Sequence, residues 1–175
     1  VLKVDEEILF ESNAIAEFLD ETVPPRLHPE DPVERARNRA WTDFVPTFSS
    51  ALNGIYYTKT CEEMEEGLAK APKAVERLEE ALSRQRSNDG PYFNGQELSL
   101  VDAAYAPFLQ RFLIADRYLK TRLLDGFPLV RAWADALMSN EMVTGAVAPE
   151  FLDEFHGNMR RREFYVATLM DDPGT

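Results

Sequence analysis

The segment Phe10–Ile15 places an acid and a hydroxyl where a short apolar run gives way to a helix. The backbone N–H groups at such a helix start lack intrahelical partners and lie at the positive end of the helix dipole. They therefore suit a carboxylate or phosphate ligand. Ser12 could assist that anion, and Glu11 beside it could hold a cation. Together the two residues predict a site for a zwitterion such as the end group of an amino acid.

Two short β-prone runs precede this site and predict a hairpin. They are Val1–Val4 and Ile8–Phe10, separated by the acidic residues 5–7. A two-stranded ribbon alone is marginal in water and leaves both of its edges unpaired. We therefore expect further strands before Val1 in the natural protein.

A helix is expected over Asn13–Asp20, with Ser12 as its N-cap and its apolar positions on one face. It is followed by the segment Thr22–Pro32, which holds four of the eleven prolines. Proline fixes the backbone and cannot donate a hydrogen bond, so this segment predicts a linker between two units.

Beyond the linker the apolar residues recur at helical spacing. Asp31 and Pro32 suit the N-cap and first turn of a long helix, and Pro46 should kink it. Its inward face is expected to carry Ala36, Ala40, Trp41, Phe44, Val45 and Phe48. Cys61–Arg86 predicts a second long helix, although a glycine and a proline inside it weaken its continuity.

Ser99 and Asp102 have the spacing of a capping box at the start of an apolar helix that runs from Leu100 to about Tyr118. This pair is interpreted as structural, because a capping box satisfies helix donors and needs no ligand. Further helices are expected at about 129–137, 141–147 and 149–169, with a turn at 88–91 and a loose tail at 171–175.

The composition is that of a globular domain with a sizeable core, since 45% of the 175 residues are hydrophobic. A net charge of −12 disfavours nucleic acid and anionic membranes as partners. No apolar run has the ~18 residues of a membrane span. A single cysteine excludes an internal disulfide and favours a reducing, cytoplasmic location. The two histidines are 128 positions apart, so no metal site is expected.

Two segments together resemble the cytosolic glutathione transferase family, in its bacterial type: Leu9–Asp20 and Asn94–Ala104. The resemblance implies a mostly α fold class, with a remnant of a thioredoxin-like α/β domain (a β-hairpin plus a helix) before an all-helical C-terminal domain. The implied boundaries are 1–22 for the first unit, 23–31 for the linker and 32–175 for the helical domain. It also implies that roughly the first half of the N-terminal domain is missing from this chain.

The resemblance further implies that Ser12 binds the γ-glutamyl carboxylate of glutathione and that Glu11 lies near its amino group. Glutathione would be the co-substrate, and no metal is needed. Phe44, Tyr105 and Phe108 are expected to line a hydrophobic substrate pocket, although aromatics at helical spacing also suit core packing. The catalytic Ser, Cys or Tyr is expected before Val1, so no catalytic residue is assigned here and this chain alone is expected to be inactive.

The function implied is transfer of the glutathione thiolate to a hydrophobic electrophile. Two alternatives stay open: a binding or regulatory protein of the same fold, and a glutathione-dependent isomerase, reductase or dehalogenase. The family usually forms homodimers, and the segments 13–20 and 31–58 are expected to contribute to the contact.

Overall fold

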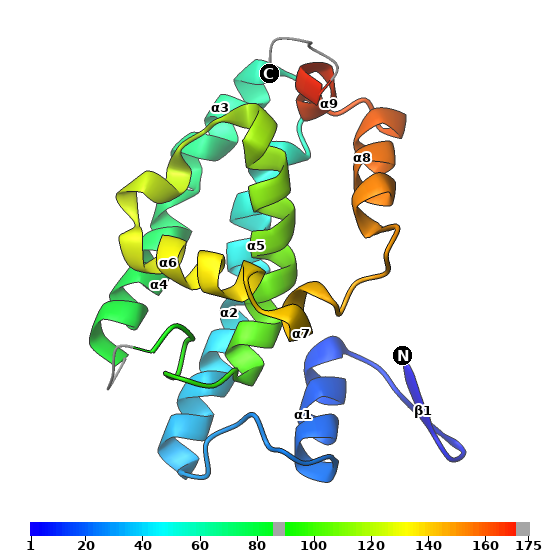
Figure 1. Cartoon of the computed structure of the whole chain (residues 1–175), viewed down its shortest axis with the longest axis vertical. Coiled ribbons are helices and arrows are strands. Elements are labelled where there is room, and N and C mark those ends of the chain that lie inside the picture. Colours follow the sequence, from blue (N-terminus) through cyan, green and yellow to red (C-terminus); the bar gives the residue numbers. More distant parts are fainter. Residues whose placement is uncertain (86–89, 171–175) are drawn as a thin grey trace.

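A two-stranded hairpin followed by helices makes up the computed structural model, which describes residues 1–85 and 90–170 (Figure 1). The predicted mostly α fold class is confirmed. Within the described residues the helices are α1 (Ser12–Thr22), α2 (Pro32–Tyr56), α3 (Cys61–Lys70), α4 (Pro72–Gln85), α5 (Leu100–Leu119), α6 (Pro128–Met138), α7 (Glu141–Thr144), α8 (Phe151–Arg161) and α9 (Tyr165–Met170), with a 3-10 turn at Leu123–Gly126.

The predicted hairpin is present. Strand β1 (Leu2–Val4) pairs antiparallel with β2 (Glu7–Leu9), and Leu2 lies opposite Leu9. Asp5 occupies the left-handed region in the turn between them. Figure 1 shows the hairpin beside α1, on the side away from the helical body.

The core lies around α2 and α5, which run side by side through the middle of the molecule (Figure 1). Large buried side chains from these two helices and from α6 fill it: Phe48, Leu52, Ile55, Tyr56, Tyr105, Leu109, Phe112, Trp133 and Leu137. Burying a side chain of this size stabilises the fold by roughly 1.5–3 kcal/mol. The core therefore holds α5 rigidly against α2.

Helix α2 begins where the sequence predicts. The Asp31 carboxylate accepts hydrogen bonds from the N–H groups of Val33 and Glu34, both at 2.9 Å. The helix continues through Pro46. Its inward face is narrower than expected, because Ala36 and Ala40 are exposed.

Two predicted helices are each divided in the structure. The helix expected over 61–86 breaks at Ala71 into α3 and α4, because Pro72 has no N–H to donate. The helix expected over 149–169 breaks between α8 and α9, where Glu163 adopts a φ of 52°. Residues 88 and 89 of the predicted turn and the predicted loose tail, 171–175, lie outside the described residues.

Candidate functional site

Helix α1 begins at a backbone conformation that side-chain-bearing residues rarely adopt. Glu11 has a φ of 67° and a ψ of 123°, and its carbonyl accepts the first helical hydrogen bond, from the N–H of Ile15 at 3.0 Å. Glu11 is therefore the N-cap, and the prediction of Ser12 as N-cap is wrong. Ser12 is the first helical residue, and no side chain caps the helix. Its exposed hydroxyl can donate to or accept from a ligand, and the first-turn N–H groups can donate to one.

A cleft of about 700 Å³ lies where the start of α1 meets α2 and α5. This volume lies within the range of small-molecule sites. Glu11, Ser12 and Phe108, all expected in a site, line it together. Its other walls are Asn13, Ala16, Glu17, Thr42, Val45, Pro46, Ser49, Leu100, Ala103, Ala104, Pro107 and Arg111. The cleft thus joins a polar end on α1 to an apolar wall on α2 and α5.

Two prolines inside helices face this cleft from opposite sides. Pro46 lies in α2 and Pro107 in α5, and both line the cleft. A proline offers no N–H, so the carbonyl four residues earlier loses its usual helical donor. The carbonyls affected are those of Thr42 and Ala103, which also belong to the cleft wall. The prolines therefore leave two helical carbonyls, on residues of the cleft wall, without their usual donor.

The wall on α5 is positioned by the capping box, whose prediction is confirmed. Ser99 and Asp102 exchange hydrogen bonds at the start of the helix. The fully buried Asp102 carboxylate also accepts from the Phe93 N–H at 2.9 Å and from the Trp133 indole N–H at 2.6 Å. This carboxylate joins the loop before α5 to α5 and α6. Its role is to hold the wall in place.

Two of the expected pocket residues lie elsewhere. Tyr105 is completely buried, and its hydroxyl donates to the Trp41 carbonyl at 2.9 Å, so it is a core residue rather than a cleft residue. Burial raises the pKa of the Tyr105 hydroxyl far above its ordinary value. Phe44 packs edge-on against Trp41 and lies beneath the Arg77 guanidinium, 4.4 Å from the ring centroid. It therefore faces α4, away from the cleft.

A charged cluster fixes α1 against α2 and the linker. One Glu17 oxygen lies 2.7 Å from the buried His28 Nε2, and the other accepts from Arg39 Nε at 3.0 Å. The Arg39 hydrogen bond is the main reason that the pKa of the Glu17 carboxyl lies below its ordinary value, although partial burial opposes this shift. The buried Asp20 carboxylate accepts from the His28 N–H at 3.2 Å. These contacts hold the second half of α1 against α2 and the linker.

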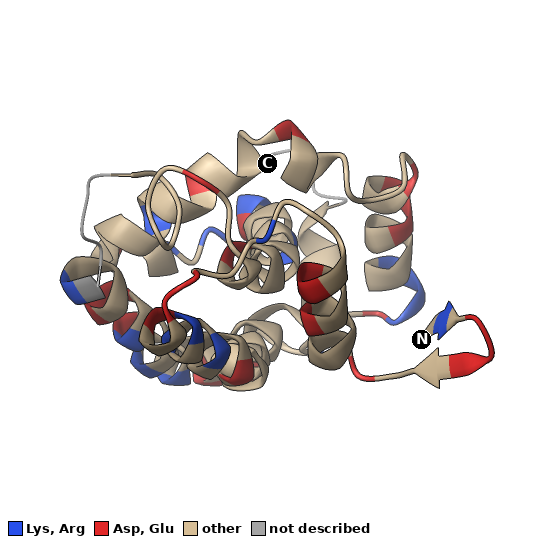
Figure 2. Ribbon diagram, turned by 90° about the horizontal axis from the view of Figure 1, so that it is seen from below, with Lys and Arg blue, Asp and Glu red and all other residues tan. Residues whose placement is uncertain are grey.

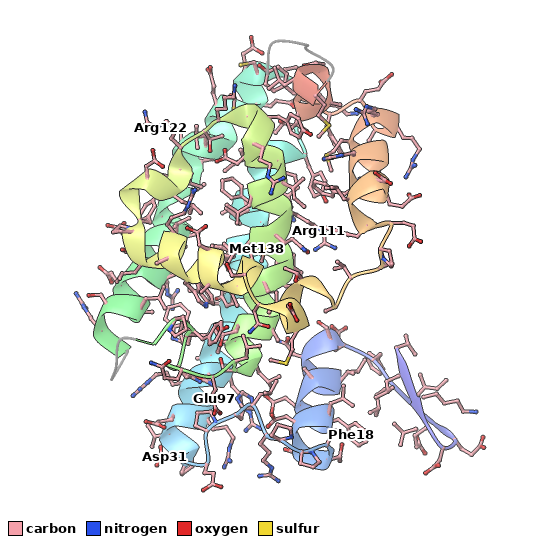
Figure 3. All side chains as sticks on the ribbon, in the orientation of Figure 1. Phe18, Asp31, Glu97, Arg111, Arg122 and Met138 are labelled. Carbon is pink, nitrogen blue, oxygen red and sulfur yellow. The ribbon has the colours of Figure 1, made fainter. Side chains whose placement is uncertain are left out.

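Arg111 is a cleft residue that the sequence-based assignment omitted. It lies on α5, and Figure 3 shows its side chain leaving that helix on the side that faces α8. The signal was present in the sequence, because Ala104, Phe108 and Arg111 follow each other at helical spacing on one face. Among the residues that the structure describes, no group of three or more His, Cys, Asp or Glu side chains could hold a metal ion.

A family model described as "Glutathione S-transferase, C-terminal domain" matches residues 62–136. The chain is similar to a probable glutathione S-transferase GSTU6 from Oryza sativa subsp. japonica, with 31% identity over 78% of this chain and 62% of the relative. Glutathione S-transferase U16 from Arabidopsis thaliana is 30% identical over 86% of this chain and 66% of its own length.

The chain belongs to the glutathione transferase family. A Tau class glutathione S-transferase from mango, Mangifera indica L., shares the fold, with a TM-score of 0.71, 22% identity and coverage of 86% of this chain and 71% of that one. The chain spans less than two thirds of the length of the two curated relatives. The two relatives and the mango structure come from plants, so the bacterial type expected from the sequence stays a prediction. Within the described part of the chain, no helix is long and apolar enough to span a bilayer.

Proposed function

We propose that the cleft binds glutathione and that the protein acts as a glutathione transferase on an electrophile held against α5. The observation that carries this proposal is the pairing of an uncapped helix start, with Ser12 exposed beside it, and an apolar wall in one cleft. A carboxylate at that helix start gains the free N–H groups, the Ser12 hydroxyl and the helix dipole. The Glu11 carboxylate is available to the neighbouring amino group.

In the proposed reaction the glutathione thiol loses its proton, and the thiolate sulfur forms a bond to an electrophilic carbon of the co-substrate while a leaving group departs from that carbon. A free thiol has a pKa of about 8.5, so a group that favours the thiolate accelerates the step. We keep the expectation that this group is a Ser, Cys or Tyr that precedes Val1. The residues of this chain supply binding and orientation, which raise the effective concentration of the two reactants.

Calorimetric titration with glutathione tests the binding step. The wild-type chain should bind, and Ser12→Ala should weaken the affinity by about tenfold, as expected for loss of a hydrogen bond to a charged group. Ser50→Ala is the matched control, because Ser50 is exposed on α2 and does not line the cleft. Absence of binding by the wild-type chain, or equal loss in both variants, would contradict the proposal. Binding without turnover by the natural protein would favour the binding-protein alternative.

We also propose that the chain self-associates through α1 and the first half of α2. Support comes from the exposed Val33, Ala36 and Ala40, which recur on one face of α2. Figure 2 shows basic residues along α2 and acidic residues on α1. In the proposed contact the exposed apolar residues of two copies face each other. We propose in addition the domain boundaries at 22 and 32 and a cytoplasmic location. The boundaries are supported by the end of α1 at Thr22 and the start of α2 at Pro32, and the location by the single cysteine.

A further inference from the structure

The charge distribution of the cleft is uneven. Among the described residues that line it, Arg111 is the one Lys or Arg, in a chain whose net charge is −12. Glu11 and Glu17 lie at the α1 end of the same cleft. Figure 3 shows Arg111 on α5, above the end of α1 where Ser12 lies. Arg111 therefore gives the α5 side of the cleft a positive charge that attracts an anionic group.

The Arg111 side chain is held in place, but its donors are mostly unused. Nη1 donates to the Pro107 carbonyl at 2.8 Å, and Cζ lies 5.2 Å from the centroid of the Phe151 ring. Guanidinium carries five N–H donors in a planar fork. The described part of the chain brings no carboxylate within 4 Å of Arg111, so the remaining edge of the fork is available to a ligand.

Arg39, in contrast to Arg111, is neutralised by carboxylates of the same chain. Its guanidinium binds the Glu17 carboxylate through two nitrogen atoms and lies 3.8 Å from Glu21. Glu17 is in turn occupied by Arg39 and His28, so the charge of Arg39 is already neutralised within the chain. Arg111 therefore differs from Arg39 in keeping its charge unpaired while facing a cleft.

The neighbours of Arg111 define the shape of the group that it can hold. Phe108 and Ala104 lie one and two helical turns before it on the same wall and offer apolar contact. The Phe151 ring covers the guanidinium from the side of α8. A ligand with an apolar body and an anionic end fits this arrangement, since its body packs on α5 and its anion reaches the free edge of the fork.

We infer that Arg111 binds a carboxylate, or another single anionic group, on the co-substrate and so selects anionic electrophiles over neutral ones of the same shape. This inference rests on the proposed function, because it assigns the second ligand of the same cleft. Arg111 acts on specificity: it binds the end of the co-substrate remote from the reacting carbon. It does not take part in bond making.

Binding of a matched pair of probes tests the inference. We would titrate 4-chloro-3-nitrobenzoate and 4-chloro-3-nitrobenzamide by calorimetry without glutathione, so that no conjugation occurs. The wild-type chain should bind the carboxylate about tenfold more tightly than the amide, and Arg111→Gln should remove this preference. Arg111→Lys should retain part of it, because the charge remains but the planar fork is lost. The preference should also shrink as salt rises.

The control is Arg122→Gln, which removes the same charge from an exposed residue that pairs with Asp125. It should leave both affinities unchanged. Equal affinity of the wild-type chain for the two probes, no binding of either probe, or a preference that survives in Arg111→Gln would overturn the inference.

A parallel titration with glutathione separates this inference from the proposed function. If the inference holds, glutathione affinity is the same in Arg111→Gln and the wild-type chain. A loss of glutathione affinity in Arg111→Gln as large as the loss for the carboxylate probe would make Arg111 a glutathione ligand and overturn the inference. Failure of the wild-type chain to bind glutathione would instead count against the proposed function, whatever the probes show.

Discussion

Asp102 ties the cleft wall on α5 to the preceding loop and to α6. Its carboxylate accepts hydrogen bonds from Phe93, Ser99 and Trp133 while completely buried. Asp102→Ala would leave these donors without partners inside the core. We expect it to lower the free energy of unfolding by about 3 kcal/mol or more, measured by urea denaturation.

Ser99→Ala is the comparison for this prediction. It removes the hydroxyl that caps α5 but leaves Asp102 and its other donors in place. A loss of about 1 kcal/mol is expected for a missing N-cap. If the two variants were equally stable, the Asp102 network would not hold α5 to α6 as the structure indicates.

Glu17 gives a stability contribution that depends on pH. The pKa of its carboxyl is lowered in the folded chain, chiefly by the hydrogen bond from Arg39, so the stabilisation is present above the unfolded pKa and is lost as pH falls through the folded pKa. Glu17→Gln should therefore reduce the free energy of unfolding by about 1 kcal/mol near neutral pH. This deficit should shrink as the pH is lowered below the ordinary value of 4.5.

Urea denaturation at neutral and acidic pH measures this difference, and Glu66→Gln is the control. Glu66 pairs with Lys70 at 3.5 Å on the exposed surface of α3, where screening weakens the pair. Its replacement should change stability little at either pH. If Glu17→Gln lowered the free energy of unfolding equally at neutral and acidic pH, the ionised state of the Glu17 carboxylate would not contribute to stability.

For single residues, the sequence indicated which side chains line the candidate cleft better than it indicated their backbone conformation and burial. Glu11 and Ser12 were expected in a site because a polar helix start is visible in the chain, whereas Phe108 was added through the resemblance to the glutathione transferase family. The left-handed conformation of Glu11 could not be predicted, since glutamate has no preference for it. Tyr105 was misassigned because helical spacing does not tell a core face from a cleft face at adjacent positions.

The crossing of α2 and α3 depends on one of two glycines. A Cβ added at Gly67 would lie 2.0 Å from the Gly54 carbonyl oxygen, so Gly67→Ala must push the two helices apart. A Cβ at Gly54 would meet nothing within 4 Å. We expect Gly67→Ala to destabilise the fold by about 1–3 kcal/mol and Gly54→Ala to stabilise it by up to about 1 kcal/mol.

Thermal or urea denaturation of the two variants reads out these opposite signs. Both substitutions are chemically identical and both lie in helices, so propensity alone would give the same gain at each position. Equal effects would mean that the close approach at Gly67 is absent in solution.

Elements were predictable where local signals were strong. The cap at Asp31 and the capping box at Ser99 fixed two helix starts, and both agree with the structure. The division of the last predicted helix was missed, because the break at Glu163 has neither proline nor glycine. The long exposed face of α2 was also missed. Apolar periodicity identifies a face that avoids water in some state of the protein, but not whether the same chain or another copy covers it.

For the whole molecule, that exposed face makes a prediction about assembly. Ala36→Glu places a charge at the centre of the proposed contact and should shift the chain from dimer to monomer in sedimentation velocity. Because Ala36 is exposed in the isolated chain, the circular dichroism spectrum should not change. Ser50→Glu on the same helix is the control and should leave the dimer intact. A wild-type chain that sediments as a monomer at every concentration would contradict the proposed self-association.

The left-handed backbone at Glu11 has a consequence for laboratory evolution. Glycine adopts a positive φ readily, whereas glutamate pays roughly 1 kcal/mol or more for it. A library of variants at this position, sorted only for resistance to heat or protease, should enrich glycine. The same library sorted for capture on immobilised glutathione should keep glutamate. Position 11 would thus record which of the two selections a population has passed through.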